Sequence, residues 1–351
     1  MKRIFTFVLS ALLAIVFTTA HAQQNIFIWK GGNLSVKSAV ETDSITSSVG
    51  SWLFSIRTSA ATSVTTNTLE ASVSVDFANN VRSLSQTPEV GVCFSSTSTT
   101  PTYADERARL GSSVQSYDFT LYELDPGTTY YYRAYVKLGD DVFYGNVKSI
   151  MTFGEKPTTP SYTLINGHKF VDLGLPSGLL WAKANVGATY SVDDGDYFAW
   201  GETSPKSTYS WSTYKWGSNP SKYNYSDGKA TLDAEDDAAT VNWGAPCRMP
   251  DSSDFQELYS QCGWSWTSNY NGASGYLVTG PNGNTIFIPA SGSRRNDDLN
   301  YHGSDGNYWS RSLYSVNTYY ARDLGFDSGY INPANYYDRY DGFAVRPVAE
   351  K

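Results

Sequence analysis

Acidic side chains gather most densely in one short segment, at Asp233, Glu235, Asp236 and Asp237. Calcium takes six to eight oxygen ligands, and carboxylates that converge in one loop can supply several of them. The same acids would also suit the N-terminus of a helix that begins at Ala238, because negative charge there complements the helix dipole. We therefore predict no cofactor, and calcium at this cluster remains the alternative.

Other groups with catalytic or metal-binding chemistry are sparse. Asp193-Asp194-Gly195-Asp196 matches the start of a calcium-binding loop but lacks its closing glutamate. Glycosidase chemistry needs two carboxylates across a cleft, and Glu202 with Glu257 or Asp254 could be named, although no spacing selects them. No nucleophile-elbow motif surrounds a serine. We predict that the chain is not an enzyme.

The strongest chemical signal is the concentration of tyrosine in residues 301–340. Nine of the 27 tyrosines lie there, where a uniform spread would place about three. Tyrosine gives a large contact area at low entropic cost, and the accompanying Asn, Ser and Gly adapt their hydrogen bonds. Because the window lacks apolar alternation, we expect an irregular binding loop whose tyrosines mostly face solvent or a ligand. Stabilisation of a long loop by the same residues is the alternative. The candidate ligand-binding residues are Tyr314, Asn317, Tyr319, Tyr320, Tyr330, Asn332, Asn335, Tyr337, Asp338 and Tyr340.

A second possible contact area is the insertion 203–229. Trp211 and Trp216 could stack on a sugar there, or they could pack the loop itself. The composition fits a glycan or protein partner rather than nucleic acid. Charged residues make up only 17% of the chain and the net charge is -8, whereas binding to phosphates requires patches of Lys and Arg.

The N-terminal 22 residues have the pattern of a secretory signal peptide. Lys2 and Arg3 supply the positive end, an apolar run follows, and Ala20-His21-Ala22 provides the cleavage pattern. The apolar run is shorter than the roughly 20 residues that a transmembrane helix needs. We expect a secreted or cell-envelope protein without a transmembrane segment after cleavage. Residues 23–49 form a lead-in segment that opens as a short hairpin.

Residues 50–154 carry the alternation and turn residues of a β-sandwich. In the clearest piece, Leu124-Asp125-Pro126-Gly127 feeds a strand in which Tyr130, Tyr132, Ala134 and Val136 share one face. This segment resembles the tyrosine corner of fibronectin type III domains. Cys93 is expected in the core of this sandwich.

Residues 155–161 form a linker with two prolines and no apolar residue, and residues 162–351 form a second domain. Asp251 and Asp254 have capping-box spacing, and Phe255, Leu258, Tyr259 and Cys262 share one helical face. Asn282-Gly283 between two apolar runs predicts a hairpin. Cys247 and Cys262 flank the helix, and a disulfide between them stays open.

The second domain contains several short sequence motifs. In chain order they are Val171-Asp172-Leu173-Gly174-Leu175, Gly195-Asp196-Tyr197-Phe198-Ala199-Trp200-Gly201-Glu202, Arg248-Met249-Pro250, Gly306-Asn307-Tyr308-Trp309-Ser310 and Gly342-Phe343-Ala344-Val345-Arg346-Pro347-Val348. As a set they resemble the Fibrobacter succinogenes major paralogous domain family of secreted bacterial proteins. The resemblance implies a C-type-lectin-like α+β fold with long loops before the final strand, and no established chemistry. Related enzymes use a C-terminal cysteine pair, and here no cysteine follows Cys262.

In similar lectin-like proteins, the position of residues 301–340 is the variable region of diversity-generating retroelement targets. The sequence therefore predicts a mostly β and α+β chain that acts in binding or adhesion, through a Tyr/Asn-rich surface presented to a glycan or protein. Retroelement-driven diversification of that surface is an open extension of this hypothesis. The alternatives are a structural subunit of a surface appendage or matrix, and a secreted carbohydrate-active enzyme.

Overall fold

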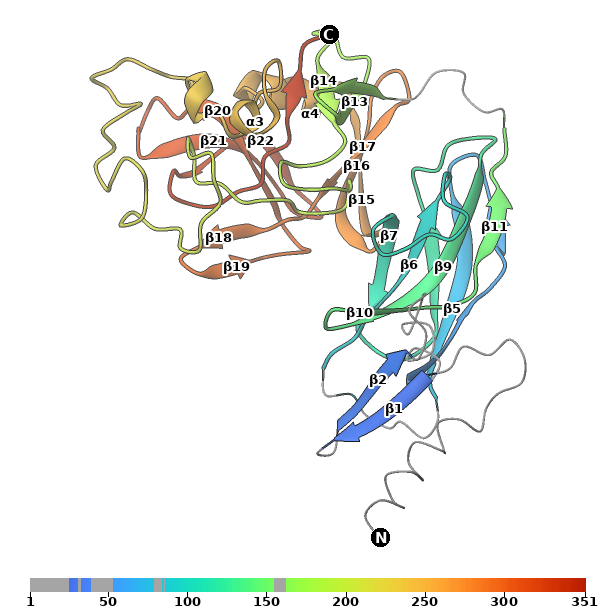
Figure 1. Ribbon diagram of the computed structural model, residues 1–351. Helices are drawn as coiled ribbons and strands as arrows, with labels where there is room; N and C mark the ends of the chain where they lie inside the picture. Colours follow the sequence, from blue (N-terminus) through green and yellow to red (C-terminus); the bar gives the residue numbers. More distant parts are fainter. Residues whose placement is uncertain (1–24, 31–32, 39–52, 79–83, 85, 155–161) are drawn as a thin grey trace, which may run out of the picture. The chain divides into compact units, whose positions relative to one another are not determined.

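The computed structural model describes residues 25–30, 33–38, 53–78, 84, 86–154 and 162–351, and the chain is mostly β-sheet (Figure 1). It divides into two compact units, Met1–Lys156 and Pro157–Lys351. The predicted signal peptide (1–22) and linker (155–161) lie outside the described residues. In the lead-in segment, β1 (Asn25–Lys30) pairs antiparallel with β2 (Asn33–Ser38), as the predicted hairpin requires.

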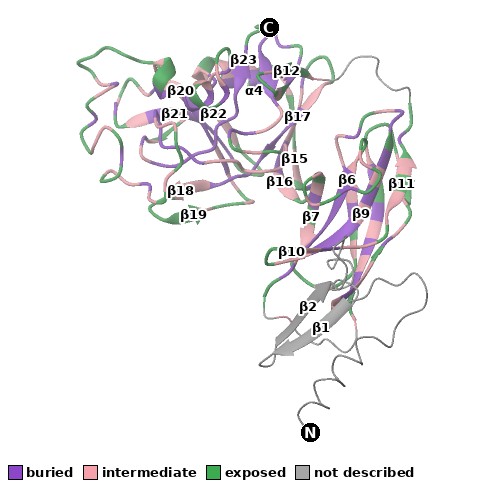
Figure 2. Cartoon of the chain, viewed as in Figure 1, coloured by how far each residue is buried: buried purple, intermediate pink, exposed green. Residues whose placement is uncertain are grey.

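The first unit contains a β-sandwich. One sheet is built from β3 (Phe54–Thr58), β4 (Ser63–Val64), β5 (Leu69–Phe77) and β8 (Tyr117–Leu121). The other has the order β10-β9-β6-β7, with β11 also on β9; its strands are β6 (Glu89–Ser95), β7 (Glu106–Gly111), β9 (Thr129–Leu138), β10 (Asp141–Tyr144) and β11 (Lys148–Met151). Apolar side chains from both sheets form the buried core (Figure 2).

The predicted strand face in this sandwich is confirmed. Tyr130, Tyr132, Ala134 and Val136 are all buried, because alternate residues of β9 point into the core. The Asp125 N–H donates a 2.9 Å hydrogen bond to the hydroxyl oxygen of Tyr130, so the tyrosine ties the incoming turn to the strand. Cys93 is fully buried, as expected.

The second unit begins and ends in one sheet, of order β12-β13-β14-β23. Its strands are β12 (Thr163–Ile165), β13 (His168–Asp172), β14 (Leu180–Ala182) and β23 (Val348–Ala349). A second sheet contains β15 (Gly263–Tyr270), β16 (Ala273–Thr279) and β17 (Thr285–Pro289), and β18 (Ser293–Arg295) pairs with β19 (Asp298–Asn300). The predicted hairpin is confirmed, since Thr279 pairs with Thr285 across Asn282-Gly283.

The predicted helix is α4 (Ser252–Gln261), and its first turn is capped as expected: the Asp251 N–H donates to the Asp254 carboxylate at 2.8 Å. Phe255 and Leu258 are buried. Tyr259, which the sequence places on the same helical face, is 41% exposed. The helix packs on the sheet β20-β21-β22 through its Phe255 and Leu258 side, which leaves Tyr259 at the rim.

The tyrosine-rich window is not the irregular loop that the sequence predicted. It contains β20 (Gly306–Leu313), β21 (Tyr320–Phe326) and β22 (Ile331–Asp338), which pair in that order as an antiparallel sheet. The ladder shifts register between Trp309 and Leu313, and again between Asp323 and Gly325. These irregularities break the period-two pattern, which explains why the sequence showed no alternation.

Irregular structure lies instead in residues 183–233, between β14 and the short helix η1 (Ala234–Asp236), which precedes α3 (Ala238–Trp243). Isolated bridges anchor this segment, such as those joining Phe198 to Phe343 and Tyr209 to Asn296.

Cys247 and Cys262 are both free, so the disulfide left open is absent. Within the described residues, no helix combines the length and apolar character needed to cross a bilayer.

Candidate binding surface

A buried arginine holds the irregular segment against the tyrosine-rich sheet. Arg339 directly follows β22 and is fully buried. Its guanidinium donates hydrogen bonds to the Tyr214 hydroxyl oxygen at 2.8 Å and to three backbone carbonyls at 3.0–3.1 Å, those of Lys222, Tyr223 and Thr318. These acceptors come from residues 214–223 and from the turn between β20 and β21. One side chain therefore fixes both loops beside the sheet.

Aromatic rings surround the same guanidinium. Its central carbon lies 4.7 Å from the centre of the Trp200 ring, and 5.4–6.0 Å from the rings of Tyr214, Trp216 and Tyr223. Ring faces attract a cation when both are removed from water. Burial lowers the pKa of Arg339, yet the hydrogen-bonded oxygens and the rings around it stabilise its charge. Trp216 is half-buried and packs within the insertion 203–229, against Tyr214 and Tyr223.

Tyrosines of β21, of β22 and of the residue that follows β20 meet beside the sheet. The Tyr314 ring, just after β20, stacks on the Tyr336 ring of β22 with centroids 4.3 Å apart and planes 2° from parallel. Tyr320 of β21 lies 5.6 Å from Tyr336, and the Arg322 guanidinium lies 4.5 Å from the Tyr314 ring centre. We call Tyr314, Tyr320, Arg322 and Tyr336 the stacked-tyrosine group. Tyr336 is 46% exposed, so the group is open to a ligand.

A second aromatic group is centred on Trp211. The Trp211 ring lies 5.6 Å from Tyr319 and 5.0 Å from Tyr340, in edge-on geometry, and all three side chains are at least partly exposed. Burial, reinforced by Asp341 and Asp338, raises the pKa of Tyr340 to about 12, so its hydroxyl stays protonated. We call Trp211, Tyr319 and Tyr340 the Trp211 group. It joins one tryptophan of the insertion to two predicted binding residues.

The opposite face of β22 carries a third set. Because successive side chains of a strand point to opposite faces, Tyr337 faces away from Tyr336. The Tyr337 ring packs edge-on against Phe343 at 5.4 Å and is 41% exposed. Asn335 donates to the buried Asp323 carboxylate at 3.3 Å. Candidate residues therefore occupy both faces of β22, which is the edge strand of its sheet.

The remaining predicted residues serve turns or ion pairs. Asn317 shapes the β20–β21 turn, where its side-chain oxygen accepts from the Tyr319 N–H at 3.1 Å. Asn332 accepts from the Ala334 N–H at 3.1 Å. Asp338 pairs with Arg295 at 3.0 Å. Tyr330 is 62% exposed but precedes β22, at the far end of the hairpin from Tyr320, roughly 20 Å away for a strand of this length.

Several residues of this surface were not singled out from the sequence. Tyr336, Arg322, Asp323 and Arg339 all lie in the predicted window, but none was named as a binding residue. Tyr336 and Arg322 could have been found by writing the window as paired strands, because they lie opposite each other in the ladder. No sequence signal marks Asp323 or Arg339, whose surroundings are assembled from distant segments.

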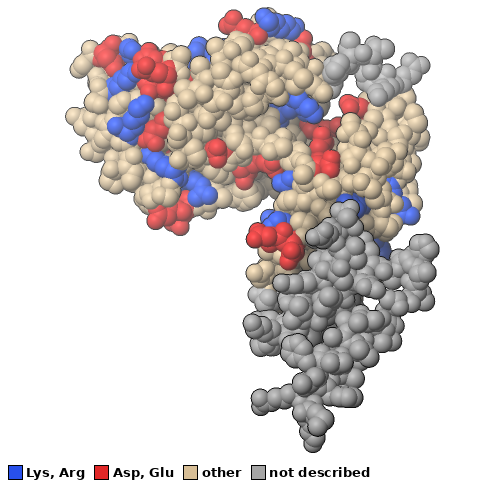
Figure 3. Space-filling view, in the orientation of Figure 1, with Lys and Arg blue, Asp and Glu red and all other residues tan. Residues whose placement is uncertain are grey.

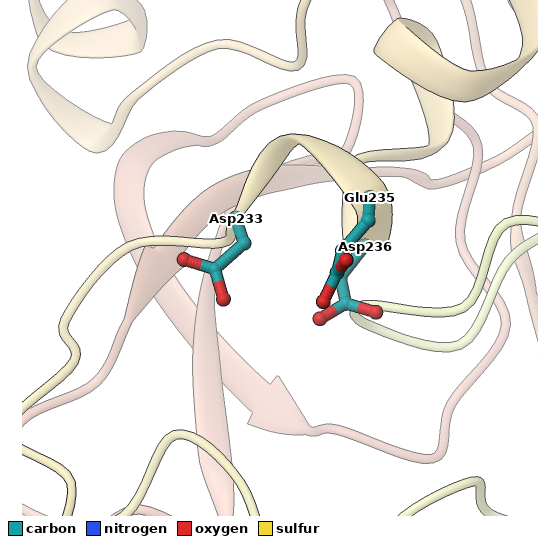
Figure 4. Close-up of side chains that lie close together, drawn as sticks. All are labelled: Asp233, Glu235 and Asp236. Carbon is teal, nitrogen blue, oxygen red and sulfur yellow. The ribbon is translucent and has the colours of Figure 1, made fainter.

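The acidic cluster considered for calcium already holds a lysine. Asp233, Glu235 and Asp236 gather at η1 (Figure 4). The Lys222 ammonium lies 2.9, 3.1 and 2.5 Å from their carboxylates. Hydrogen bonds from Lys222 and Lys229 lower the pKa of Asp233 to about 2. Asp237 caps α3 by accepting from the Thr240 N–H at 2.9 Å, which is the helix-start role weighed above. A metal ion at this cluster would have to displace an ammonium group.

The carboxylates considered for catalysis are each engaged in local structure. Glu202 pairs with Lys206 at 2.9 Å and accepts from the Lys215 N–H at 2.8 Å. Glu257 accepts two hydrogen bonds from Ser177. Asp254 serves the start of α4.

On the visible face of residues 162–351, charges of both signs are interspersed among wide uncharged areas (Figure 3).

Comparison with known proteins gives no family. No family model matches the chain, and no curated protein matches it. Among solved structures, it is similar to the sensor domain of the anti-sigma factor RsgI4 of Pseudobacteroides cellulosolvens (15% identity, 29% of this chain and 97% of that one, TM-score 0.23). It is also similar to a fibronectin type III domain of the human KIAA0970 protein (16% identity, 37% of this chain and 95% of that one, TM-score 0.23).

Proposed function

We propose that the chain is an exported binding protein, without enzymatic activity, whose second unit is lectin-like and presents tyrosines to a glycan or protein ligand. The observation that carries this proposal is the grouping of partly exposed tyrosines from separate segments on one rigid framework. Tyr336 and Tyr319 are 46% and 40% exposed, and both lie beside loops that Arg339 ties to the sheet. Large rings held in place bind with little loss of conformational freedom.

The β-sandwich of the first unit would act as a spacer that carries the binding unit away from the cell. The pairing of β14 with β23 supports the lectin-like part of the proposal, because it brings the start and the end of the second unit together in one sheet. The same surface could be diversified between relatives. Sequencing of the neighbouring DNA for a reverse transcriptase gene would test that extension.

The proposal is tested with the chain from residue 23 to 351 on arrays of glycans and extracellular protein domains. The affinity of each ligand found is then compared between the original chain and a Tyr319→Ala/Tyr336→Ala variant. This variant removes one exposed ring from each aromatic group. Tyr259→Ala is the matched control, because Tyr259 is exposed to the same degree (41%) but lies on α4. We expect binding to fall at least tenfold in the double variant only.

A structural role in an appendage or matrix makes a different prediction. The same tyrosines would then be buried between copies of the chain, so the double variant would lose self-association instead of ligand capture. Sedimentation of both proteins at increasing concentration separates the two functions.

A further inference from the structure

Asp323 is a fully buried acid whose hydrogen-bonding capacity is only partly used. It lies in β21, between Trp309 of β20 and Asn335 of β22. Its Oδ2 accepts from the side-chain amides of Asn307 and Asn335, both at the long distance of 3.3 Å. No described residue donates a hydrogen bond to its Oδ1. A buried oxygen without a donor destabilises the fold, so this site favours an added donor.

Acids and arginines both lie near Asp323 and Tyr337. Burial, together with the charges of Asp323, Asp341 and Asp305, raises the pKa of Tyr337 on the neighbouring strand. Arg295 opposes them, but it is committed to Asp341 through two bonds of 2.9 and 2.7 Å. Arg322 also acts on Asp323, while its side chain donates to the Ala334 carbonyl and contacts Tyr314. Neither arginine pairs with Asp323 directly, so an added cation would compensate its charge.

The spacing of these acids indicates what kind of cation fits. Among the described residues, the acids close enough together to share one metal ion are Asp233, Glu235 and Asp236, and Asp323 is not among them. A cation that spans a wider gap and donates N–H bonds suits the site better. Tyr337 adds a half-exposed ring, and a ring face attracts an ammonium group.

We propose that the cluster of Asn307, Asp323, Asn335 and Tyr337 binds a primary ammonium group, such as the side chain of a lysine on a protein ligand. The inference rests on the proposed binding function and narrows its ligand class. Asn307 and Asn335 are half-exposed and donate only long bonds to Asp323. When they turn outward, the ammonium donates to the Asp323 carboxylate and their own side-chain oxygens accept its other N–H bonds.

The test uses the chain from residue 23 to 351 and two small probes of equal length. Nα-acetyl-lysine methylamide carries the ammonium group, and Nα-acetyl-norleucine methylamide lacks it. Calorimetry should show saturable binding of the lysine probe at millimolar concentrations, and norleucine should bind at least tenfold more weakly. With the protein labelled by ¹⁵N at asparagine, the side-chain amide signals of Asn307 and Asn335 should shift only with lysine.

Two variants and one control locate the site. Asp323→Asn should weaken binding of the lysine probe at least tenfold, and Tyr337→Leu, a change at a half-exposed position, should weaken it about threefold. Asp298→Asn removes an exposed acid of β19 and should leave the affinity unchanged. Near-ultraviolet circular dichroism confirms that each variant is folded.

The proposal is overturned if the lysine probe does not bind, if norleucine binds equally well, or if Asp323→Asn and Tyr337→Leu bind lysine like the original chain. Tyr319 and Tyr336 are not part of this cluster, so the two hypotheses can fail separately. Loss of array binding in Tyr319→Ala/Tyr336→Ala, without any binding of the lysine probe, would refute the ammonium site and leave the proposed function standing.

Discussion

The Nε of Arg339 donates a 2.8 Å hydrogen bond to the hydroxyl oxygen of Tyr214, and both side chains are buried. The two residues are far apart in the sequence, one in the irregular segment and the other at the end of β22. The remaining donors of Arg339 bind backbone carbonyls of the same irregular segment, at Lys222 and Tyr223, and of the turn between β20 and β21, at Thr318. This one side chain therefore holds both segments beside the sheet. The tyrosine surface therefore depends on a side chain that is itself fully buried.

Removal of that side chain should loosen the surface. We expect Arg339→Met to lower the free energy of unfolding of the second unit by roughly 3 kcal/mol or more, because each buried acceptor left without a donor costs about 1–3 kcal/mol. Urea unfolding followed by tryptophan fluorescence measures it, since eight of the ten tryptophans lie in residues 162–351. As a control, Lys229→Met removes a half-exposed ion pair and should change stability by less than about 1 kcal/mol. Equal effects of the two substitutions would refute the role of Arg339.

Gly201 and Gly217 allow a close comparison of packing. Both have positive φ, +77° and +75°, so alanine strains the backbone equally at either position. At Gly201 a Cβ would lie 2.3 Å from the Trp216 ring, whereas at Gly217 it would meet open space. Gly217→Ala should destabilise by about 1–2 kcal/mol, and Gly201→Ala by roughly a further 1–3 kcal/mol from overpacking. If urea unfolding shows no difference between them, Trp216 is not packed in the insertion as described.

Asp323 should make stability depend on pH. Burial raises its pKa from 3.8 to about 7. Between these values the folded chain holds a proton that the unfolded chain has released, so the free energy of unfolding falls as pH rises. This one group should make the free energy of unfolding about 4 kcal/mol lower above pH 7 than below pH 4. Burial also raises the pKa of Asp341, beside Arg295, to about 6. Asp341 therefore adds a further decrease in the free energy of unfolding as pH rises.

Asp323→Asn removes the larger of these two effects. The variant should gain stability relative to the original chain between pH 4.5 and pH 8, in urea unfolding at each pH. Asp341, Asp305, Tyr337, Arg295 and Arg322 face the site in both proteins, so their titration cancels to first order in the comparison. A difference between the two proteins that stays constant with pH would show that Asp323 is ionised normally.

The lysine within the acidic cluster gives a prediction about calcium. Calcium should not raise the melting temperature of the original chain, because the Lys222 ammonium lies within 3.1 Å of all three carboxylates. Lys222→Met leaves Asp233, Glu235 and Asp236 with less compensation, and calcium should then raise the melting temperature. A calcium response in the original chain that is lost on adding a chelator would contradict this account.

Local patterns predicted part of this structure, and their limits have physical causes. The strand face of Tyr130 and Tyr132, the start of α4 at Asp251 and the hairpin at Asn282-Gly283 each depend on neighbours in sequence, and all are confirmed. The sheet β20-β21-β22 was missed because its register shifts disrupt the alternation of apolar residues.

The site was predictable in composition but not in arrangement. The excess of tyrosine in residues 301–340 is a property of the sequence, whereas the stack of Tyr314 on Tyr336 requires the pairing of three strands. Arg339 gave no signal because its partners are carbonyl oxygens and rings, not a nearby acid. The role of Asp323 depends on burial, which a single aspartate between polar and apolar residues does not reveal.

The central claim is that exposed tyrosines on the Arg339-supported framework bind a ligand. The most direct measurement compares the dissociation constants of the original chain, Tyr319→Ala/Tyr336→Ala and the control Tyr259→Ala for a ligand found on the glycan and protein arrays. The account predicts at least tenfold weaker binding for the double variant and unchanged binding for the control. Equal affinity of all three proteins, or no ligand on either array, would contradict it.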